Sequence, residues 1–168
     1  MIQTISGDLL DIKDGIICHQ VNYLGIMGGG VAAAIREKLL TEEQYQSYVD
    51  YARQAGRTAM GTVQFIGCGD LIVANMFCQD DAIARGDMKS APITSYEALA
   101  RCLVRVRTMA RLQGKRVYIP YHLGCGIAGG DWGVVEHVIK SVFDGYPEEA
   151  YIVKRQQERS QEYDRAEM

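Results

Sequence analysis

The chain repeats two patterns of apolar and polar positions, and each pattern predicts one kind of element. Apolar runs of about four to eight residues between turn residues are typical of strands, whereas apolar residues spaced three or four apart are typical of amphipathic helices. Strands are predicted at Met1 to Ile5, Gly15 to Val21, Gly61 to Ile66, Leu71 to Phe77, Arg116 to Tyr121 and Ala150 to Val153. Stretches with helical spacing lie between these runs, so the pattern predicts an α/β fold.

Several of the predicted helices have recognisable ends. Thr41 and Thr94 are each followed three positions later by Gln or Glu, the spacing of a capping box that satisfies two N–H groups at a helix start. The helices that begin there are expected to stop at Gly56 and Gly114, since glycine commonly ends a helix. A further helix is predicted from Asp131.

The segment Gly67 to Asp70 separates two adjacent predicted strands. It fits a tight hairpin turn, so the sheet is predicted to be mixed rather than purely parallel. A length of 168 residues and an apolar content of 48% fit one domain with a continuous core. We expect that domain to cover residues 1–155, and residues 156–168 to form a polar tail that is frayed or disordered.

Charge and cysteine content exclude several classes of protein. A net charge of -3 argues against direct binding to a nucleic-acid backbone. No apolar stretch is long enough to span a membrane and no signal-peptide pattern is present, so we expect a cytoplasmic protein without membrane contact. The five cysteines lack metal-ligand spacing, which predicts neither disulfides nor a metal site. Cys125 is the best candidate for a reactive thiol, since helix N-termini stabilise thiolates, and packing of a small residue explains it equally well.

Two glycine-rich loops carry the strongest functional signal. The first glycine loop is Gly25 to Gly30, and the second glycine loop is Gly124 to Gly130. Each follows a predicted strand and leads into a predicted helix. Glycine allows a positive φ and close approach of a ligand, and a helix start presents unpaired N–H groups with a partial positive charge. The two loops together predict a clamp for a diphosphate.

A dinucleotide-binding dehydrogenase is an alternative, because Gly28 to Ala33 matches the pattern G-x-G-x-x-A. Such a fold needs a second parallel strand that ends in an acidic residue for the ribose. The segment Thr41 to Ala55 is instead polar and helical, and Asp50 has the spacing without that context. The sequence also lacks the G-x-x-x-x-G-K-[ST] pattern of a P-loop. Both nucleotide-binding classes are therefore excluded.

The chain resembles the macrodomain (Appr-1''-p processing) family of ADP-ribose binders. The resemblance covers residues 1–155 and rests on Gly7 to Leu10, His19 to Asn22, Met27 to Ala32 and Gly124 to Trp132. It implies a three-layer α/β/α fold with a mixed central sheet of about six strands. It also implies that the ligand is ADP-ribose or an ADP-ribosylated macromolecule, and that no cofactor is required.

The resemblance assigns roles in ligand binding. Asp8 is expected to accept a hydrogen bond from the adenine amino group, and Asn22 to meet the distal ribose. Gly28, Gly29 and Gly30 are expected to wrap that ribose and one phosphate. In the second glycine loop the expected contacts to the diphosphate come from Gly124, Cys125, Gly126, Ile127, Ala128 and Gly129.

Some of these assignments have alternatives. Asp8 also fits an aspartate that caps a turn or a helix, and Asn22 also fits an asparagine that bonds its own loop backbone. Adenine usually needs a flat or apolar neighbour. The aromatic residues near the loops are Tyr23, Phe77, Tyr121 and Trp132. The sequence does not choose among them.

The branch that the chain resembles most contains the terminal ADP-ribose protein glycohydrolases and bacterial DNA ADP-ribose glycohydrolases. In that branch a lysine attacks the anomeric carbon of the distal ribose and an aspartate in the second glycine loop assists. Lys89 lies in the corresponding loop, where it also fits a solvated charge. The aspartate position is occupied by Ala128, and Asp131 follows three residues later, where it also fits a helix cap.

A phosphatase that acts on ADP-ribose 1''-phosphate is a further enzymatic possibility. His19 would then be a general acid or base and Asp131 would orient water. His19 also fits a packed strand residue, and His122 is an equal candidate. Two function classes therefore remain open: a hydrolase of an ADP-ribose derivative, and a reader that binds ADP-ribose without chemistry.

Overall fold

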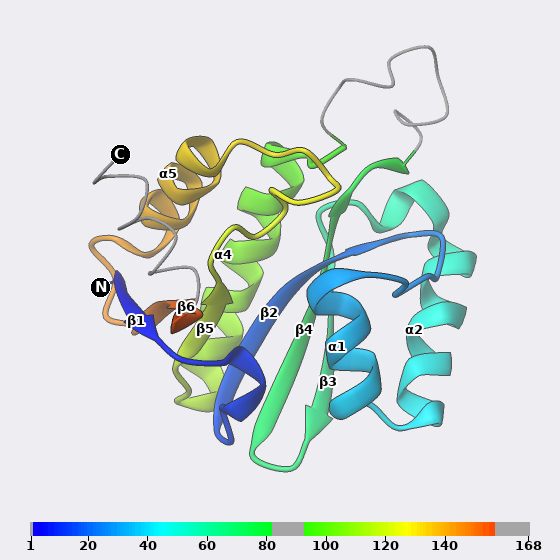
Figure 1. Ribbon diagram of the computed structural model, residues 1–168, viewed down its shortest axis with the longest axis horizontal. Coiled ribbons are helices and arrows are strands. Elements are labelled where there is room, and N and C mark those ends of the chain that lie inside the picture. The colour runs from blue at the N-terminus through cyan, green and yellow to red at the C-terminus, as the bar shows by residue number, and fades with distance from the viewer. Residues whose placement is uncertain (1, 82–92, 157–168) are drawn as a thin grey trace.

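A six-stranded sheet forms the centre of the protein, as Figure 1 shows. The computed structural model describes residues 2–81 and 93–156. The strands are β1 (Ile2–Ser6), β2 (Gly15–Asn22), β3 (Val63–Cys68), β4 (Leu71–Gln79), β5 (Val117–Pro120) and β6 (Ala150–Lys154). They lie in the order β1-β6-β5-β2-β4-β3. Each predicted strand is present, with ends that differ by one or two residues.

The predicted hairpin makes the sheet mixed. β3 and β4 are antiparallel, with Cys68 opposite Leu71, and the turn between them contains Gly69 at φ 67°. The pairs β1–β6, β6–β5, β5–β2 and β2–β4 are all parallel. The carboxyl ends of β2, β4 and β5 therefore point to one edge of the sheet, where ligands bind in open α/β folds.

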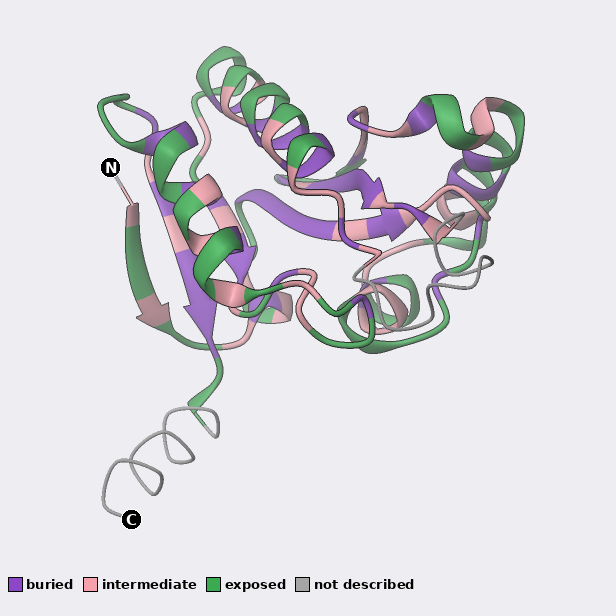
Figure 2. Cartoon of the chain, turned by 90° about the horizontal axis from the view of Figure 1, so that it is seen from above, coloured by how far each residue is buried: buried purple, intermediate pink, exposed green. Residues whose placement is uncertain are grey.

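Helices cover both faces of the sheet and give the expected three layers (Figures 1 and 2). They are α1 (Gly30–Lys38), α2 (Glu42–Ala55), α4 (Tyr96–Gln113) and α5 (Trp132–Phe143), with 3-10 turns η1 (Leu9–Asp11) and η2 (Gly56–Ala59). Alternation along β2 assigns the faces. Ile16 and Cys18 join the core under α4 and α5, whereas Ile17 packs with Ile35 of α1. Phe77 of β4 joins the core under α2.

The start of α4 corrects one prediction about helix capping. Thr41 does form a capping box with Gln44 at the start of α2. At α4 the cap is Ser95, whose hydroxyl accepts from the N–H of Ala98, and not Thr94. The Thr94 hydroxyl instead donates to the carbonyl oxygen of Gly124, 2.7 Å away. A tertiary hydrogen bond thus takes the first of two adjacent hydroxyls, and the second caps the helix.

Besides Met1, two stretches lie outside the part of the chain that the structure describes. They are residues 82–92, which include Lys89, and residues 157–168 of the predicted tail.

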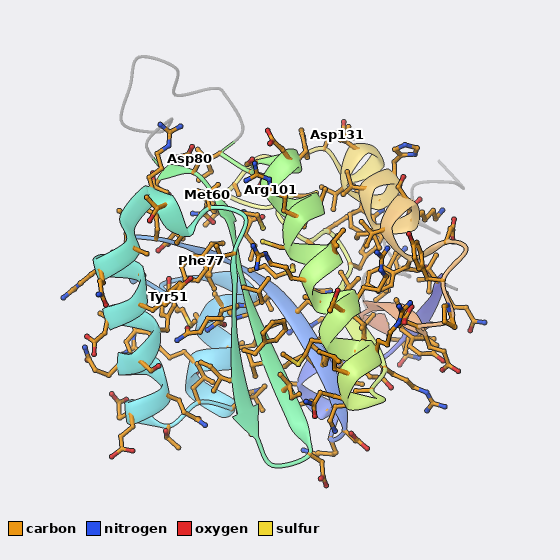
Figure 3. All side chains as sticks on the ribbon, turned by 180° about the vertical axis from the view of Figure 1, so that it is seen from behind. Tyr51, Met60, Phe77, Asp80, Arg101 and Asp131 are labelled. Carbon is orange, nitrogen blue, oxygen red and sulfur yellow. The ribbon has the colours of Figure 1, made fainter. Side chains whose placement is uncertain are left out.

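Among the described helices, none is both long enough and apolar enough to cross a membrane. Figure 3 shows Asp80 and Asp131 at the same edge of the molecule, the edge to which β4 and β5 point.

Candidate functional site

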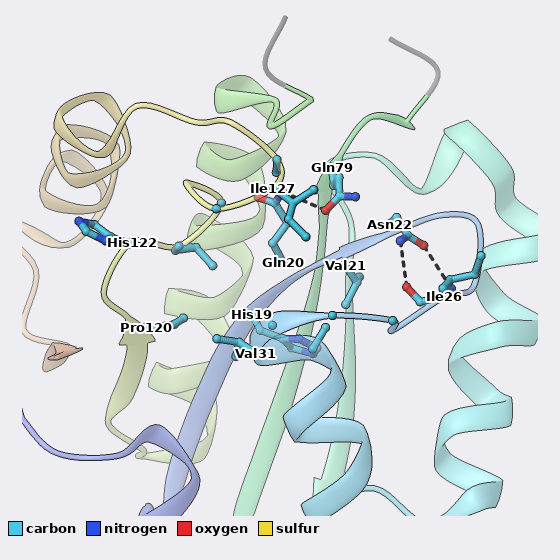
Figure 4. A pocket seen from close by; sticks show the side chains of 18 of the residues that line it. His19, Gln20, Val21, Asn22, Ile26, Val31, Gln79, Pro120, His122 and Ile127 are labelled. Carbon is cyan, nitrogen blue, oxygen red and sulfur yellow. Dashed lines mark hydrogen bonds between the residues drawn. The ribbon is translucent and has the colours of Figure 1, made fainter. Parts of the chain in front are cut away.

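The two glycine loops line one cleft, because they follow the neighbouring parallel strands β2 and β5. The cleft has a volume of about 380 Å³ (Figure 4). The loops nearly touch at its mouth. A Cβ added to Gly29 would lie 4.0 Å from Cδ1 of Ile127, whose side chain is 97% exposed. The residues predicted to bind ligand that line this cleft are Asn22, Gly28, Gly29, Gly30, Gly124, Gly126, Ile127 and Ala128.

A second cavity of about 260 Å³ continues the cleft toward η1. The two cavities share Gly30, Val31, Pro120 and Tyr121, so they form one groove. Asp8 lines the second cavity. Its Oδ1 caps η1 by accepting from the N–H of Leu10 at 2.9 Å, while Oδ2 has no hydrogen-bond partner among residues 2–81 and 93–156. Asp8 is therefore a turn cap with one carboxylate oxygen left over, and its contact with adenine stays a prediction.

The first glycine loop runs directly into an uncapped helix. Gly29 is the N-cap of α1, with extended backbone and no side chain to accept from the first turn. Gly30 follows at φ 59°. Within the described ranges the N–H groups of Gly28 and Gly29 have no partner, and those of Gly30 and Val31 lack one because an α-helix leaves its first N–H groups unpaired. This helix end keeps its donors and its partial positive charge available.

The second glycine loop closes on itself by backbone hydrogen bonds. The N–H of Gly130 donates to the oxygen of Gly124 at 2.9 Å, and that of Gly129 donates to the oxygen of Gly126 at 3.0 Å. In the part of the chain described, the N–H groups of Gly126, Ile127 and Ala128 remain without partners. Consecutive free N–H groups in such a turn form an anion-binding concavity.

The helix after the second loop does not contribute its N-terminus to the cleft, which corrects the prediction that both loops use a helix start. α5 begins at Trp132, and the Asp131 carboxylate caps it by accepting from the N–H of Val134 at 3.1 Å. Asp131 does not line the cleft. The helix-cap interpretation of Asp131 therefore describes its contacts, and the donors of the second loop come from the turn alone.

Packing requires two glycines of the second loop, Gly124 and Gly130, and Gly124 also has a positive φ. Gly124 has a φ of 69°, and a Cβ on it would lie 2.6 Å from Oε1 of Gln20. A Cβ on Gly130 would lie 2.6 Å from the backbone oxygen of Gly124. Gly126 differs, since a Cβ there would meet no atom within 4 Å. The glycine pattern predicts the loop but not these separate roles.

Cys125 does not line the cleft, and neither does Gly129. The Cys125 thiol donates to the oxygen of Leu123, with 3.3 Å between Sγ and O. Burial, with a smaller effect of the Asp131 charge, raises the pKa of Cys125 to about 11. This shift is opposite to that of a reactive thiolate, because the residue is not at the start of α5, and it favours the alternative in which Cys125 is a packed small residue.

Asn22 lines the cleft, but its side chain is hydrogen-bonded mainly within its own loop. Its Oδ1 accepts from the N–H groups of Leu24 and Ile26 and from the hydroxyl of Tyr48, and its Nδ2 donates to the oxygen of Ile26. Figure 4 shows these bonds to Ile26. Asn22 therefore shapes the first glycine loop, and a contact with a ribose stays a prediction.

The structure distinguishes the four aromatic candidates. Tyr121 lines both cavities, at the junction of the groove. Phe77 is fully buried, and the hydroxyl of Tyr23 donates to Asp80. Trp132 packs edge-on against Tyr121, with 4.9 Å between ring centroids. Of these four, Tyr121 alone borders the groove, so it is the candidate neighbour of adenine.

The two histidines named as acid or base candidates differ in environment. His19 is 1% exposed, and its Nε2 lies 2.5 Å from Oδ1 of Asn75. Burial lowers the pKa of His19 to about 4, so the ring is neutral near pH 7. A group with that pKa is poorly suited to general acid catalysis. His122 is exposed at the cleft, has a φ of 62° and stacks on Tyr121.

Gln20 and Thr94 hold the second loop in place, and neither role was predicted from the sequence. Nε2 of Gln20 donates to the Thr94 hydroxyl at 3.1 Å, and that hydroxyl donates in turn to Gly124. The available signal was the Gln20 amide within the largely buried strand β2. In the described ranges no cluster of His, Cys, Asp and Glu is placed to hold a metal ion.

Solved structures resemble this chain over most of its length. A protein of unknown function from Bacteroides thetaiotaomicron is 28% identical, with a TM-score of 0.76, over 92% of this chain and 98% of that one. The macrodomain of Mycobacterium tuberculosis DarG is 23% identical, with a TM-score of 0.72, over 91% and 96%. A macrodomain protein from Streptomyces coelicolor is 28% identical, with a TM-score of 0.68, over 90% and 98%. No family model and no curated protein matches the sequence.

A more distant neighbour was solved with a ligand. Thermosipho africanus DarTG, in complex with ADP-ribose, is 16% identical with a TM-score of 0.67, over 90% of this chain and 40% of that one. The two macrodomains from Mycobacterium tuberculosis and Streptomyces coelicolor each match at least 90% of this chain, which includes its six-stranded mixed sheet, at TM-scores of 0.72 and 0.68. The protein described here therefore has the macrodomain fold.

Proposed function

We propose that the protein binds ADP-ribose in the groove between the two glycine loops. One observation carries this proposal: two chain segments present unpaired N–H groups to a single cleft. These donors come from Gly28 to Val31 at an uncapped helix start and from Gly126 to Ala128 in a turn. Such an arrangement suits the two phosphates of a diphosphate.

The shape of the groove supports one orientation of the ligand. Adenine lies toward Asp8, whose Oδ2 is able to accept from its amino group, and Tyr121 borders the junction between the cavities. The diphosphate lies between the loops, and the distal ribose lies beside Gly28, Gly29 and Gly30. The ADP-ribose complex of a DarTG protein with the same fold supports this choice of ligand.

The cleft binds an anion without a charged side chain in its described lining. Its lining residues in the described ranges include no Asp, Glu, Lys or Arg. Affinity for the diphosphate therefore comes from backbone donors and the dipole of α1, which act over short distances. We expect the ligand to be recognised by its shape and hydroxyls as well as by its charge.

Calorimetric titration tests the proposal with three ligands. ADP-ribose is expected to bind at one site per chain, ADP more weakly, and AMP more weakly again, since each lacks contacts that the longer ligand makes. Equal affinity for ADP-ribose and AMP would contradict a site built around the diphosphate. No heat with any of the three ligands, together with no thermal stabilisation, would overturn the proposal.

Hydrolysis of an ADP-ribosyl bond is the finer part of the proposal, and it depends on Lys89. The resemblance to the terminal ADP-ribose protein glycohydrolase branch supports a role for this lysine, which lies outside the described residues. Asp131 caps α5 and lies off the cleft lining, and His19 is buried and neutral. One alternative is a phosphatase, which would turn over ADP-ribose 1''-phosphate alone. The other is a reader that binds ADP-ribose or an ADP-ribosylated macromolecule without cleaving it.

Turnover assays separate the enzyme from the reader. The substrates are ADP-ribosylated protein, ADP-ribosylated DNA and ADP-ribose 1''-phosphate. A glycohydrolase that uses Lys89 releases ADP-ribose from one of the first two and loses this activity in Lys89→Ala, with ADP-ribose affinity retained. Binding with no turnover of any substrate supports the reader, and turnover that survives Lys89→Ala contradicts the proposed nucleophile.

A further inference from the structure

A row of polar side chains crosses three strands beneath α1 and α2. His19 on β2 pairs in register with Asn75 on β4, and Asn75 pairs in register with Gln64 on β3. Their side chains are hydrogen-bonded in that order, and Gln64 continues the row to Ser47 on α2. The row therefore joins the floor of the cleft, which His19 lines, to the outer surface of α2.

The row fixes which nitrogen of His19 carries the proton. Nδ2 of Asn75 donates to Oε1 of Gln64 at 3.2 Å, so Oδ1 of Asn75 is the atom that faces His19. A carbonyl oxygen only accepts, and Nε2 of His19 must therefore carry the hydrogen. Since burial keeps the ring neutral, Nδ1 is left with a lone pair and no proton.

Nδ1 of His19 is a buried acceptor without a partner in the described ranges. Buried polar atoms are nearly always hydrogen-bonded, and an orphan inside an apolar strand destabilises the protein. The orphan here belongs to a residue that lines the cleft, on the side of the first glycine loop where Figure 4 shows it. The position indicates that a ligand supplies the missing donor.

We propose that Nδ1 of His19 accepts a hydrogen bond from a hydroxyl of the distal ribose and makes the site specific for that sugar. Asn75 and Gln64 are positioning residues that hold the tautomer. The inference rests on the proposed binding of ADP-ribose, which places the distal ribose beside Gly28 to Gly30. A hydroxyl is able to donate to a lone pair, whereas an ionised phosphate oxygen is repelled by it. Nδ1 has almost no accessible surface, so the lining has to shift to admit the hydroxyl.

The direct test follows the ring nitrogens of His19 by long-range ¹H–¹⁵N NMR with ADP-ribose and with ADP. ADP is the matched control ligand because it lacks the distal ribose. In the free protein the proton is expected on Nε2. ADP-ribose is expected to shift the Nδ1 resonance as that atom accepts a hydrogen bond, and ADP to leave it unchanged. A proton on Nδ1, or saturating ADP-ribose without a change at Nδ1, would overturn the inference.

Variants give a second test. The ratio of ADP-ribose affinity to ADP affinity is expected to fall about tenfold in His19→Phe, because a site built to bond a hydroxyl loses discrimination when its acceptor is removed. His137→Phe, at an exposed position on α5, is the matched control and is expected to keep the ratio. A His19→Phe protein that binds both ligands with the original ratio contradicts the role of Nδ1.

The role of Asn75 as a positioning residue is tested by the tautomer of His19 in a variant. Asn75→Leu is expected to lower the same affinity ratio and to produce a mixture of His19 tautomers in the NMR spectrum. If a variant does not fold, the ligand comparison on the unaltered protein still decides. Failure of ADP-ribose to bind at all is a different result, since it removes the proposed function rather than the role of His19.

Discussion

The two glycine loops reach the same cleft by different structural routes. The first continues straight into α1, whose N-cap Gly29 has no side chain to satisfy the first turn. The second folds back through hydrogen bonds between Gly130 and Gly124 and between Gly129 and Gly126, and Asp131 separates it from α5 as a cap. Similar composition therefore produces an open helix end in one loop and a closed turn in the other.

Glycine content therefore identifies a site of backbone N–H donors, but it does not tell whether those donors come from a helix end or from a turn. An open helix end adds its dipole to the free N–H groups, whereas the capped α5 gives its first-turn donor to Asp131. The first loop is therefore free to bind anions at the cost of helix stability, and the second is held by its own packing. Altering each loop in turn tests this division.

The largest expected effect is a dependence of the free energy of unfolding on pH. It comes from His19, the histidine on the side of the first loop. A free histidine titrates at about 6.5, whereas burial lowers the pKa of His19 to about 4. The unfolded chain therefore takes up a proton first as pH falls. The free energy of unfolding should decrease by about 3 kcal/mol between these two pKa values. Urea unfolding of the wild-type protein and His19→Phe at several pH values measures it, and identical pH dependence of the two would contradict the buried neutral ring.

The next effect separates two glycines within the second loop. Gly130→Ala places a Cβ against the backbone oxygen of Gly124, which is unable to move aside without opening the turn. We expect a loss of about 2 kcal/mol in the free energy of unfolding. Gly126→Ala is the matched control, since its Cβ meets nothing within 4 Å. Equal stabilities of the two variants would show that the closed turn is not what requires glycine.

Capping the first loop should weaken binding while it strengthens the helix. In Gly29→Asp the new carboxylate is able to accept from the first turn of α1, which we expect to stabilise the protein by a few tenths of a kcal/mol. The same carboxylate competes with the ligand diphosphate for donors and repels it, so affinity for ADP-ribose should fall about tenfold, roughly 1.4 kcal/mol. Scanning calorimetry measures the gain in stability, and titration calorimetry measures the loss of affinity for ADP-ribose. Undiminished affinity would mean that the helix end is not used.

Removing the cap of α5, the helix after the second loop, should lower the stability of the protein and leave its affinity for ADP-ribose nearly unchanged. Asp131→Ala removes the acceptor of the Val134 N–H and should lower the free energy of unfolding by about 1 kcal/mol. Affinity for ADP-ribose should stay within about twofold, because Asp131 does not line the cleft. A large loss of affinity with unchanged stability would place Asp131 at the ligand instead of at the helix.

Local sequence was sufficient to predict the strands, the hairpin and one helix cap. It was not sufficient to predict which distant residues the polar side chains contact. The strands, the hairpin at Gly69 and the cap at Thr41 depend on neighbours in sequence, and their predictions are confirmed. Thr94 and Ser95 are both good caps, and only the distant Gly124 decides that Ser95 takes the role. The cap prediction at α4 was wrong for this reason.

The candidate site was likewise predictable from the sequence only in part. The sequence identified both glycine loops, and both line one cleft. It did not predict that Tyr121 borders the groove, since that depends on how η1 and β5 come together. It also did not predict the row from His19 to Gln64, because strand register places these residues side by side. Assignments that need three-dimensional neighbours were therefore left open.

The most direct test of the clamp is the backbone amide NMR spectrum during titration with ADP-ribose. We expect the largest shifts in two groups of amides, Gly28 to Val31 and Gly126 to Ala128. The amide of Val134, which Asp131 caps, should hardly move. Binding with shifts confined to one loop, or with the largest shifts at the start of α5, would contradict a diphosphate clamp formed by both loops.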